Sequence, residues 1–153
     1  RMHILFVCSG NTCRSPMAQA LFTDHVKNTG KKMQWNQLIA KSAGLRAFDG
    51  SPASPAAVMV MTEMGLNISN HRSRRLNTEL VEWADVILTM EDSYRREIME
   101  QYDVPAQKVY TLAAFSRDSA GDILDPFGFE IETYRQCARQ INSMIRNIVK
   151  SFS

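Results

Sequence analysis

Two side chains near the start of the chain could together carry out nucleophilic chemistry on a phosphoryl group. Cys8 stands six residues before Arg14, and Gly10 and Asn11 lie between them. A thiolate is a strong nucleophile, and the planar guanidinium fork can hold two oxygens of a bound phosphoryl group. Gly10 permits backbone angles that other residues resist, and Asn11 can take the left-handed conformation and bond across the loop. Ser15 can donate its hydroxyl to the thiolate, so this stretch suits an attack of sulfur on phosphorus.

The elements on either side of this loop would give it its shape and charge. The run His3-Ile4-Leu5-Phe6-Val7 is typical of a strand that is buried on both faces. After the loop, Ser15 suits the N-cap and Pro16 the first position of a helix that runs to about Asn28. The helix N-terminus adds about half a positive charge, so we expect the pKa of the Cys8 thiol to be lowered. The alternative is an ordinary strand–helix turn in which Cys8 is buried and inert.

The rest of the chain alternates strands with helices, which predicts an α/β fold. We expect a three-layer sandwich, with a four-stranded parallel sheet and about five helices on its two faces, in one domain over residues 2–153. The expected strands cover residues 4–7, 38–42, 85–90 and 108–112, and the expected helices cover residues 15–28, 55–64, 77–83, 91–101 and 131–152. Residues 117–129 are expected to form a long loop. Ligands of such sheets bind at the carboxyl ends of the strands, where the loop after Cys8 would lie.

Composition narrows the class of protein. Of the 153 residues, 44% are hydrophobic and 22% are charged, and the formal net charge is +2. These values are typical of a globular protein, and so small a net charge gives no reason to expect nucleic acid or a membrane as partner. We see no signal peptide and no apolar run of the roughly 20 residues that a membrane span needs. Three cysteines do not form a disulfide framework, so we expect reduced thiols in a cytoplasmic protein, and the three widely spaced histidines suggest no metal site.

At this point the chain resembles a known family, the low-molecular-weight protein tyrosine phosphatases. The resemblance is carried by V-C-S-G-N-T-C-R-S-P near the start, by Asp125-Pro126-Phe127 before the last helix, and by the chain length. It implies that Cys8 is the nucleophile, that Arg14 binds and stabilises the phosphoryl group, and that Asp125 is the general acid and later the base that activates water. The implied substrate is a phosphorylated protein, and no cofactor is implied. Phosphate or another oxyanion would bind to the loop residues Ser9, Gly10, Asn11, Thr12, Cys13, Arg14 and Ser15.

Two further positions match the supporting residues of that family. The resemblance implies that Ser42 and His71 form hydrogen bonds with Asn11 and keep the loop rigid. Each residue also has an ordinary interpretation, because Ser42 could simply end a strand and His71 could be a solvated histidine beside Arg72.

Thr12 and Phe127 bear on which phosphorylated residue the protein would accept. Typical tyrosine-specific members of the family carry a bulkier aliphatic residue in place of Thr12, and tyrosines straight after the Asp-Pro pair. The pairing of Thr12 with Phe127 resembles the bacterial protein arginine phosphatases, a branch of the same family. A threonine hydroxyl can bond a guanidinium, whereas an aliphatic residue favours an aromatic ring, so phosphoarginine is the expected substrate. Phosphotyrosine is the alternative, in which Thr12 merely packs, and Phe129-Glu130 departs from the pattern of the arginine-specific branch.

Two other classes of protein share parts of this pattern. A thiol-dependent arsenate reductase would need two more cysteines for a disulfide relay, but Cys137 is the only cysteine beyond the loop and its spacing places it on an apolar helix face. A non-catalytic phosphoprotein-binding module would be expected to lack Cys8 or Asp125, and both are present.

The two loop cysteines also suggest redox control. Cys8 and Cys13 are close enough in the loop to form a reversible disulfide, so we expect a thiol reductant to reverse inactivation by peroxide. The alternative is that Cys13 only packs behind the loop.

Overall fold

The fold is built around its first strand. The computed structural model describes residues 2–29 and 37–152. Strand β1, Met2–Cys8, has the two-sided apolar pattern that its sequence predicts, and its residues from position 4 onward are buried. It lies inside a four-stranded sheet of order β2-β1-β3-β4, with β2 at Leu38–Gly44, β3 at Val86–Thr89 and β4 at Val109–Thr111. All three pairings are parallel, which confirms the predicted sheet.

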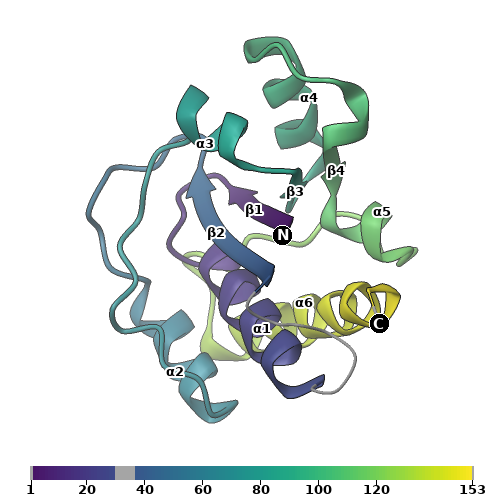
Figure 1. Cartoon of the computed structure of the whole chain (residues 1–153). Coiled ribbons are helices and arrows are strands. Elements are labelled where there is room, and N and C mark those ends of the chain that lie inside the picture. The colour runs from purple at the N-terminus through teal and green to yellow at the C-terminus, as the bar shows by residue number, and fades with distance from the viewer. Residues whose placement is uncertain (1, 30–36, 153) are drawn as a thin grey trace.

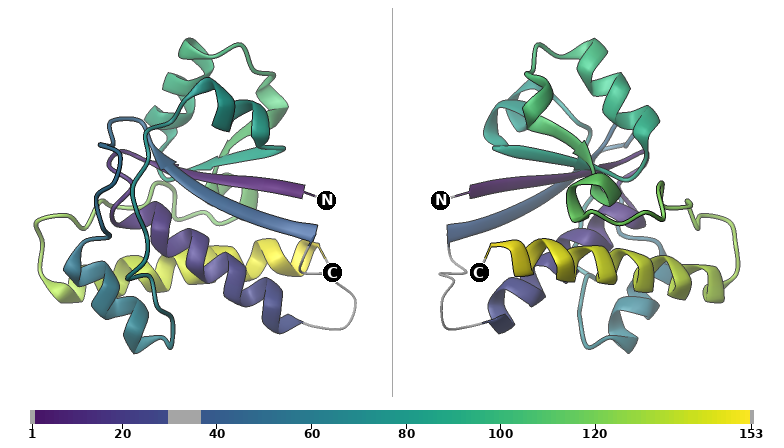
Figure 2. Two further views of the ribbon diagram at one scale, coloured as in Figure 1. Left: turned by 60° about the vertical axis from the view of Figure 1, so that its left-hand side comes forward. Right: turned by 90° about the vertical axis from the view of Figure 1, so that its right-hand side faces the viewer.

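Helices cover both faces of this sheet and complete the three layers (Figures 1 and 2). Helix α1 and helix α6 pack together across one face, and α2 packs against α6. The short helix α3 contacts β1, and α4 contacts β3 and β4, on the other face. Helix α5 packs on α6 next to β4. The helices are α1 at Arg14–Thr29, α2 at Pro55–Glu63, α3 at Thr78–Trp83, α4 at Asp92–Gln101, α5 at Leu112–Ser116 and α6 at Ile131–Ser151.

The core lies between the sheet and the α1–α6 layer. Phe6 of β1 meets Phe22 of α1 with 5.8 Å between ring centroids, and both side chains are fully buried. Ile141 and Ile145 lie one helical turn apart on the buried face of α6, as their spacing predicts. Among the helices of residues 2–29 and 37–152, none combines the length and the apolar character that crossing a bilayer requires.

The described part of the chain has six α-helices, close to the number of about five that was expected, and the additional helix α5 follows directly after β4. The Thr111 hydroxyl accepts a hydrogen bond from the amide of Ala114 at 3.0 Å, which caps that helix, and Arg117 ends it in the left-handed conformation. Helix α1 already begins at Arg14, so Ser15 lies inside the first turn instead of capping it.

The topology brings the carboxyl ends of the strands to one edge. The chain passes from β1 to β2 on one side and then to β3 on the other side of β1, so the strand order reverses next to β1. In the register, Cys8 lies opposite Gly44 of β2, and Val7 lies opposite Thr89 of β3. Residues that follow these three strands therefore meet at the reversal point, which is where open α/β sheets bind ligands.

Candidate active site

The loop between β1 and α1, residues 8–15, is called the phosphate loop below. Asn11 takes the left-handed conformation with φ 56°, as its residue type permits. Its side-chain amide donates to the Ser15 hydroxyl at 2.8 Å, and its side-chain oxygen accepts from the Arg74 amide at 2.9 Å. Hydrogen bonds to Ser15 and Arg74 therefore hold Asn11 in its left-handed conformation. Gly10 is exposed and does not have a positive φ, so the special backbone angle expected of Gly10 belongs to Asn11 instead.

Cys8 is buried at the bottom of this loop. Its Sγ lies 2.8 Å from the Ser15 hydroxyl and accepts from the Asn11 amide at 3.2 Å, which confirms the expected Cys8–Ser15 contact. Burial nevertheless raises the pKa of the Cys8 thiol, and the Ser15 hydroxyl, the charge of Arg14 and the loop amides only partly oppose this effect. The lowered pKa expected from the sequence is wrong for this conformation, because the side chain is only 2% exposed and desolvation penalises the thiolate. The same donors remain in place to stabilise the anion once it forms.

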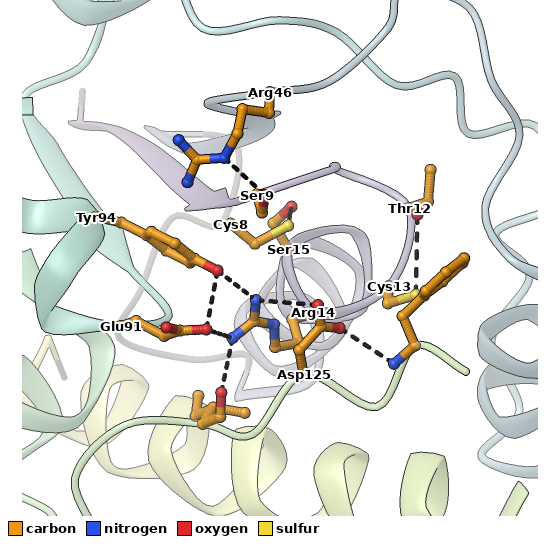
Figure 3. A network of polar contacts seen from close by, with 12 residues as sticks. Cys8, Ser9, Thr12, Cys13, Arg14, Ser15, Arg46, Glu91, Tyr94 and Asp125 are labelled. Carbon is orange, nitrogen blue, oxygen red and sulfur yellow. Dashed lines mark hydrogen bonds and ion pairs between the residues drawn. The ribbon is translucent and has the colours of Figure 1, made fainter. Parts of the chain in front are cut away.

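Arg14 is held by two residues that the sequence interpretation missed (Figure 3). Its guanidinium is 1% exposed, donates to the Glu91 carboxylate at 2.6 Å and donates to the Tyr94 hydroxyl at 2.9 Å. The carbonyl of Ile123 accepts a third bond at 2.7 Å. Buried charge needs such partners, and the set fixes the plane of the guanidinium fork. Glu91 could have been found from its place directly after β3, at the edge of the sheet where Cys8 ends β1.

Asp125 reaches the same site from the loop before α6. Its side chain is 47% exposed, and one carboxylate oxygen lies 3.7 Å from the guanidinium of Arg14. The other carboxylate oxygen accepts from the Phe127 amide at 3.1 Å, a local turn that fixes the direction of the side chain. Figure 3 shows Asp125 and the pair Glu91–Tyr94 on different sides of the Arg14 fork. Asp125 is thus the carboxylate that stays accessible, whereas Glu91 is engaged with Arg14 and Tyr94.

One of the two expected supporting contacts is present. The Nε2 atom of His71 lies 2.8 Å from the Asn11 carbonyl, which confirms the hydrogen bond expected between these residues. Burial lowers the pKa of His71 and outweighs the bond to Asn11, and the charges of Arg74 and Arg72 lower it further. The imidazole is therefore neutral near pH 7 and donates its Nε2 proton to the carbonyl.

The other expected contact, between Ser42 and Asn11, is wrong. The Ser42 hydroxyl donates to the side-chain oxygen of Gln19 at 2.7 Å. The register explains this, because Ser42 lies opposite Phe6, two residues before the level of the phosphate loop. The Arg74 amide takes the place that Ser42 was expected to fill beside the Asn11 side chain.

Gly44 allows the end of β2 to approach the phosphate loop closely. A Cβ atom at this position would lie 2.5 Å from the Ser9 carbonyl and 2.9 Å from the Asn11 amide. Both of these are backbone atoms, so neither can move without shifting the loop itself. The expected strand over residues 38–42 ends before Gly44, and only the pairing of Gly44 with Cys8 shows the role of this glycine.

We predict that Gly44→Ala deforms the phosphate loop. Because a displacement of about 1 Å can cost two orders of magnitude in rate, kcat/KM should fall by about 100-fold. Steady-state kinetics on a phosphorylated peptide would measure this loss. Gly65→Ala is the matched control, since Gly65 has φ 82° at the end of α2 and lies outside the site. That control should lower thermal stability and leave kcat/KM nearly unchanged; equal kinetic losses in the two variants would contradict the role of Gly44.

Cys8, Arg14 and Asp125 line one pocket of about 310 Å³ together with the other phosphate-loop residues up to Cys13. Thr12 and Phe127 also line it, so the two positions expected to affect specificity do meet at its mouth. Phe48 and Arg46 of the loop after β2 form another part of the wall. Phe127 is 68% exposed and Phe48 is 81% exposed, which is unusual for such large apolar side chains.

Cys13 lines the pocket but its sulfur has partners of its own. Its Sγ donates to the Ser54 hydroxyl at 3.3 Å and lies 3.6 Å from the Tyr134 hydroxyl. Both Cys8 and Cys13 are free thiols in this structure. The reversible disulfide between them therefore stays a prediction.

A buried sulfur nucleophile, a fixed guanidinium and an accessible carboxylate in one pocket define a site for thiol-dependent phosphoryl transfer. Comparison with known proteins leads to the same class, since residues 3–153 match the family described as low molecular weight phosphotyrosine protein phosphatase. The chain is 38% identical over 149 residues to a protein-arginine-phosphatase of Bacillus subtilis, which covers 97% of this chain and 95% of that protein. It is 40% identical over 147 residues to a protein-arginine-phosphatase of Geobacillus stearothermophilus, which covers 96% and 93% of the two chains.

Structural comparison agrees with these sequence matches. A solved structure of a cysteine-to-serine variant of the YwlE arginine phosphatase, with a phosphorylated active-site serine, has a TM-score of 0.91 at 36% identity and covers 99% of this chain and 95% of its own. The chain therefore belongs to the low molecular weight phosphotyrosine protein phosphatase family.

Proposed function

We propose that this protein is a cysteine-dependent protein phosphatase that hydrolyses phosphoarginine in proteins through a phosphocysteine intermediate. The observation that carries the proposal is the convergence of Cys8, Arg14 and Asp125 on one pocket at the carboxyl ends of the strands. Asp125 lies more than a hundred residues after Cys8 and Arg14 in the chain, and the fold brings its side chain to the same pocket.

In the first step, Cys8 Sγ forms a bond to phosphorus as a thiolate. The bond from phosphorus to the leaving atom breaks, and Asp125 gives its proton to that atom, a guanidinium nitrogen in phosphoarginine. Arg14 and the loop amides bind the phosphoryl oxygens throughout. In the second step, the Asp125 carboxylate takes a proton from water, the water oxygen bonds to phosphorus and the sulfur–phosphorus bond breaks. The products are inorganic phosphate and the free Cys8 thiolate, which the Ser15 hydroxyl stabilises.

The preference for phosphoarginine rests on the mouth of the pocket. Thr12 offers a hydroxyl that can bond a guanidinium, and its Oγ1 lies 3.8 Å from Cys13 Sγ. Once Asp125 has given up its proton, its half-exposed carboxylate can pair with the positive charge of the leaving guanidinium. The names of the Bacillus and Geobacillus relatives support this choice. Phosphotyrosine remains the competing substrate, since the exposed Phe48 and Phe127 could also pack on an aromatic ring.

We predict that Thr12→Ile moves the preference from phosphoarginine toward phosphotyrosine. Removing the hydroxyl leaves the guanidinium without a partner, and the larger aliphatic side chain gains contact with a ring, so the ratio of the two kcat/KM values should fall by about tenfold. The measurement uses two peptides that differ only in the phosphorylated residue. Thr78→Ile, at an exposed position of α3, is the control that should keep the wild-type ratio. An unchanged ratio in Thr12→Ile would reject this account of specificity, and a wild-type preference for phosphotyrosine would reject phosphoarginine as the substrate.

The proposal extends to where the protein works. We infer that its partners are phosphorylated proteins in the cytoplasm rather than nucleic acid or a membrane, and that phosphate and related oxyanions compete for the phosphate loop. The small net charge of +2 and three free cysteines support this assignment.

A further inference from the structure

The segment between α2 and α3 contains one buried serine among exposed arginines. Ser73 is 3% exposed, whereas Arg72, Arg74 and Arg75 on either side of it are exposed. A buried hydroxyl in a polar surface segment needs partners, and all of its partners lie in the loop after β2. That loop, residues 45–52, is called the wall loop below because Arg46, Phe48 and Ser51 line the pocket.

Ser73 joins the wall loop through four hydrogen bonds. Its hydroxyl donates to the carbonyl of Phe48 and accepts from the amide of Ser51 at 3.0 Å. Its backbone amide donates to the Ser51 carbonyl at 2.7 Å, and its carbonyl accepts from the amide of Gly50 at 2.8 Å. One side chain thus satisfies the backbone on both sides of the turn that carries Phe48.

The phosphate loop is held by different residues of the same segment. The His71 side chain bonds the Asn11 carbonyl, and the Arg74 amide bonds the Asn11 side chain. Removal of the Ser73 hydroxyl would therefore loosen the wall loop at Phe48 and Ser51, keep the two backbone bonds from Ser73 to that loop, and leave both contacts to Asn11 in place. Only the Phe48 carbonyl and the Ser51 amide would lose a partner.

Phe48 has the properties of a side chain that acts on a ligand. It is 81% exposed at the pocket, so its position cannot come from its own packing and must come from its backbone. The side chains of phosphoarginine and phosphotyrosine both contain an apolar stem between the peptide backbone and the phosphorylated atom. The stem has three methylenes in phosphoarginine and a ring in phosphotyrosine. Such a stem can contact Phe48 while the phosphoryl group lies in the phosphate loop.

We propose that Ser73 is a positioning residue for substrate binding: its hydroxyl fixes the Phe48 backbone so that Phe48 packs on the apolar stem of the leaving group. This inference rests on the proposed phosphatase function and holds for either leaving group. Ser73 touches neither the phosphoryl group nor Cys8, so it should affect substrate affinity and not the chemical step.

The first test is a separation of KM from kcat. In Ser73→Ala, loss of hydrogen bonds to the wall loop should raise KM for a phosphopeptide about fivefold, while kcat and competitive inhibition by inorganic phosphate change by less than about twofold. Ser69→Ala is the matched control, because the Ser69 hydroxyl of the same segment donates to the nearby Asn67 side chain. A general structural defect would instead lower kcat or weaken inhibition by phosphate, and either result would overturn the inference.

The second test asks whether Ser73 acts through Phe48. Phe48→Ala should raise KM by a similar or larger factor, and adding Ser73→Ala to that variant should cause no further rise. Full multiplication of the two effects would overturn the inference, because Ser73 would then act on something else. Turnover of the phosphopeptides by the wild type tests the proposed function separately. If the wild type shows no turnover, both the phosphatase function and the role of Ser73 are rejected. If the wild type turns over normally and the effects of the two substitutions on KM multiply, only the role of Ser73 is rejected.

Discussion

Replacing Cys8 by serine is expected to abolish turnover. The Cys8 sulfur is the nucleophile of the proposed mechanism, and a serine hydroxyl at neutral pH is a far weaker nucleophile than a thiolate. Loss of a nucleophile in a preorganised site costs several orders of magnitude, so kcat should fall by about 10⁴-fold or more. Steady-state assays on a phosphopeptide and on an aryl phosphate would both show the loss.

The control for this variant is Cys137→Ala. Cys137 is 5% exposed on the apolar face of α6 and takes no part in the proposed chemistry. Its removal should cost some thermal stability and leave kcat close to the wild-type value. Because inorganic phosphate is held by Arg14 and the loop amides, Cys8→Ser should still bind it in a calorimetric titration. Turnover near the wild-type rate in Cys8→Ser would reject the mechanism as a whole.

The second large effect is expected for Asp125→Asn, and it should depend on the leaving group. An amide has no proton of suitable acidity to donate, so the variant must expel the leaving group without help. For phosphoarginine peptides, kcat/KM should fall by about 10²- to 10⁴-fold. For 4-nitrophenyl phosphate, whose phenolate is a stable anion, the loss in kcat/KM should be much smaller, because this ratio reports the step that forms phosphocysteine.

A neighbouring aspartate in the same loop provides the control. The Asp118 side chain accepts from the Ala120 amide in a local turn, and Asp118 is not among the residues that line the pocket. Asp118→Asn should therefore leave the kinetics on both substrates unchanged. An equal loss on both substrates in Asp125→Asn would rule out Asp125 as the general acid, and would leave it only a part in binding.

The local features of the site could be predicted from the sequence, because they depend on residues close together in the chain. The apolar run before Cys8 makes a buried strand, and Asn11 takes the left-handed conformation that its side chain tolerates. The contact between Cys8 and Ser15 joins the two ends of the phosphate loop, which are close together in the chain. Asp125 reaches the pocket from far along the chain, and the family motif placed it there where spacing alone could not.

Contacts between distant segments could not be predicted in the same way. Which residue faces Asn11 depends on strand register: Ser42 lies opposite Phe6, two residues before the end of β2, and bonds Gln19. The Arg74 amide, from the segment between α2 and α3, bonds the Asn11 side chain instead. The partners of Arg14 depend on how α4 sits at the end of β3, so Tyr94 carries no sequence signal of its own. The sequence predicts a lowered pKa for Cys8, because the hydrogen-bond donors around the sulfur lie in the loop itself. The burial that raises this pKa is a property of the whole fold and cannot be read from the loop.

The most direct test of the central claim is a search for the covalent intermediate. The Asp125→Asn variant, mixed with 4-nitrophenyl phosphate and quenched in acid, lacks the base that activates water, so phosphocysteine should accumulate. Peptide mass spectrometry is then expected to find one phosphoryl group, on Cys8. A parallel reaction with the Cys8→Ser protein should give no phosphoryl group on either of its remaining cysteines. In the Asp125→Asn variant, a phosphoryl group on any residue other than Cys8, or a burst of nitrophenolate with no covalent adduct, would contradict the proposed mechanism.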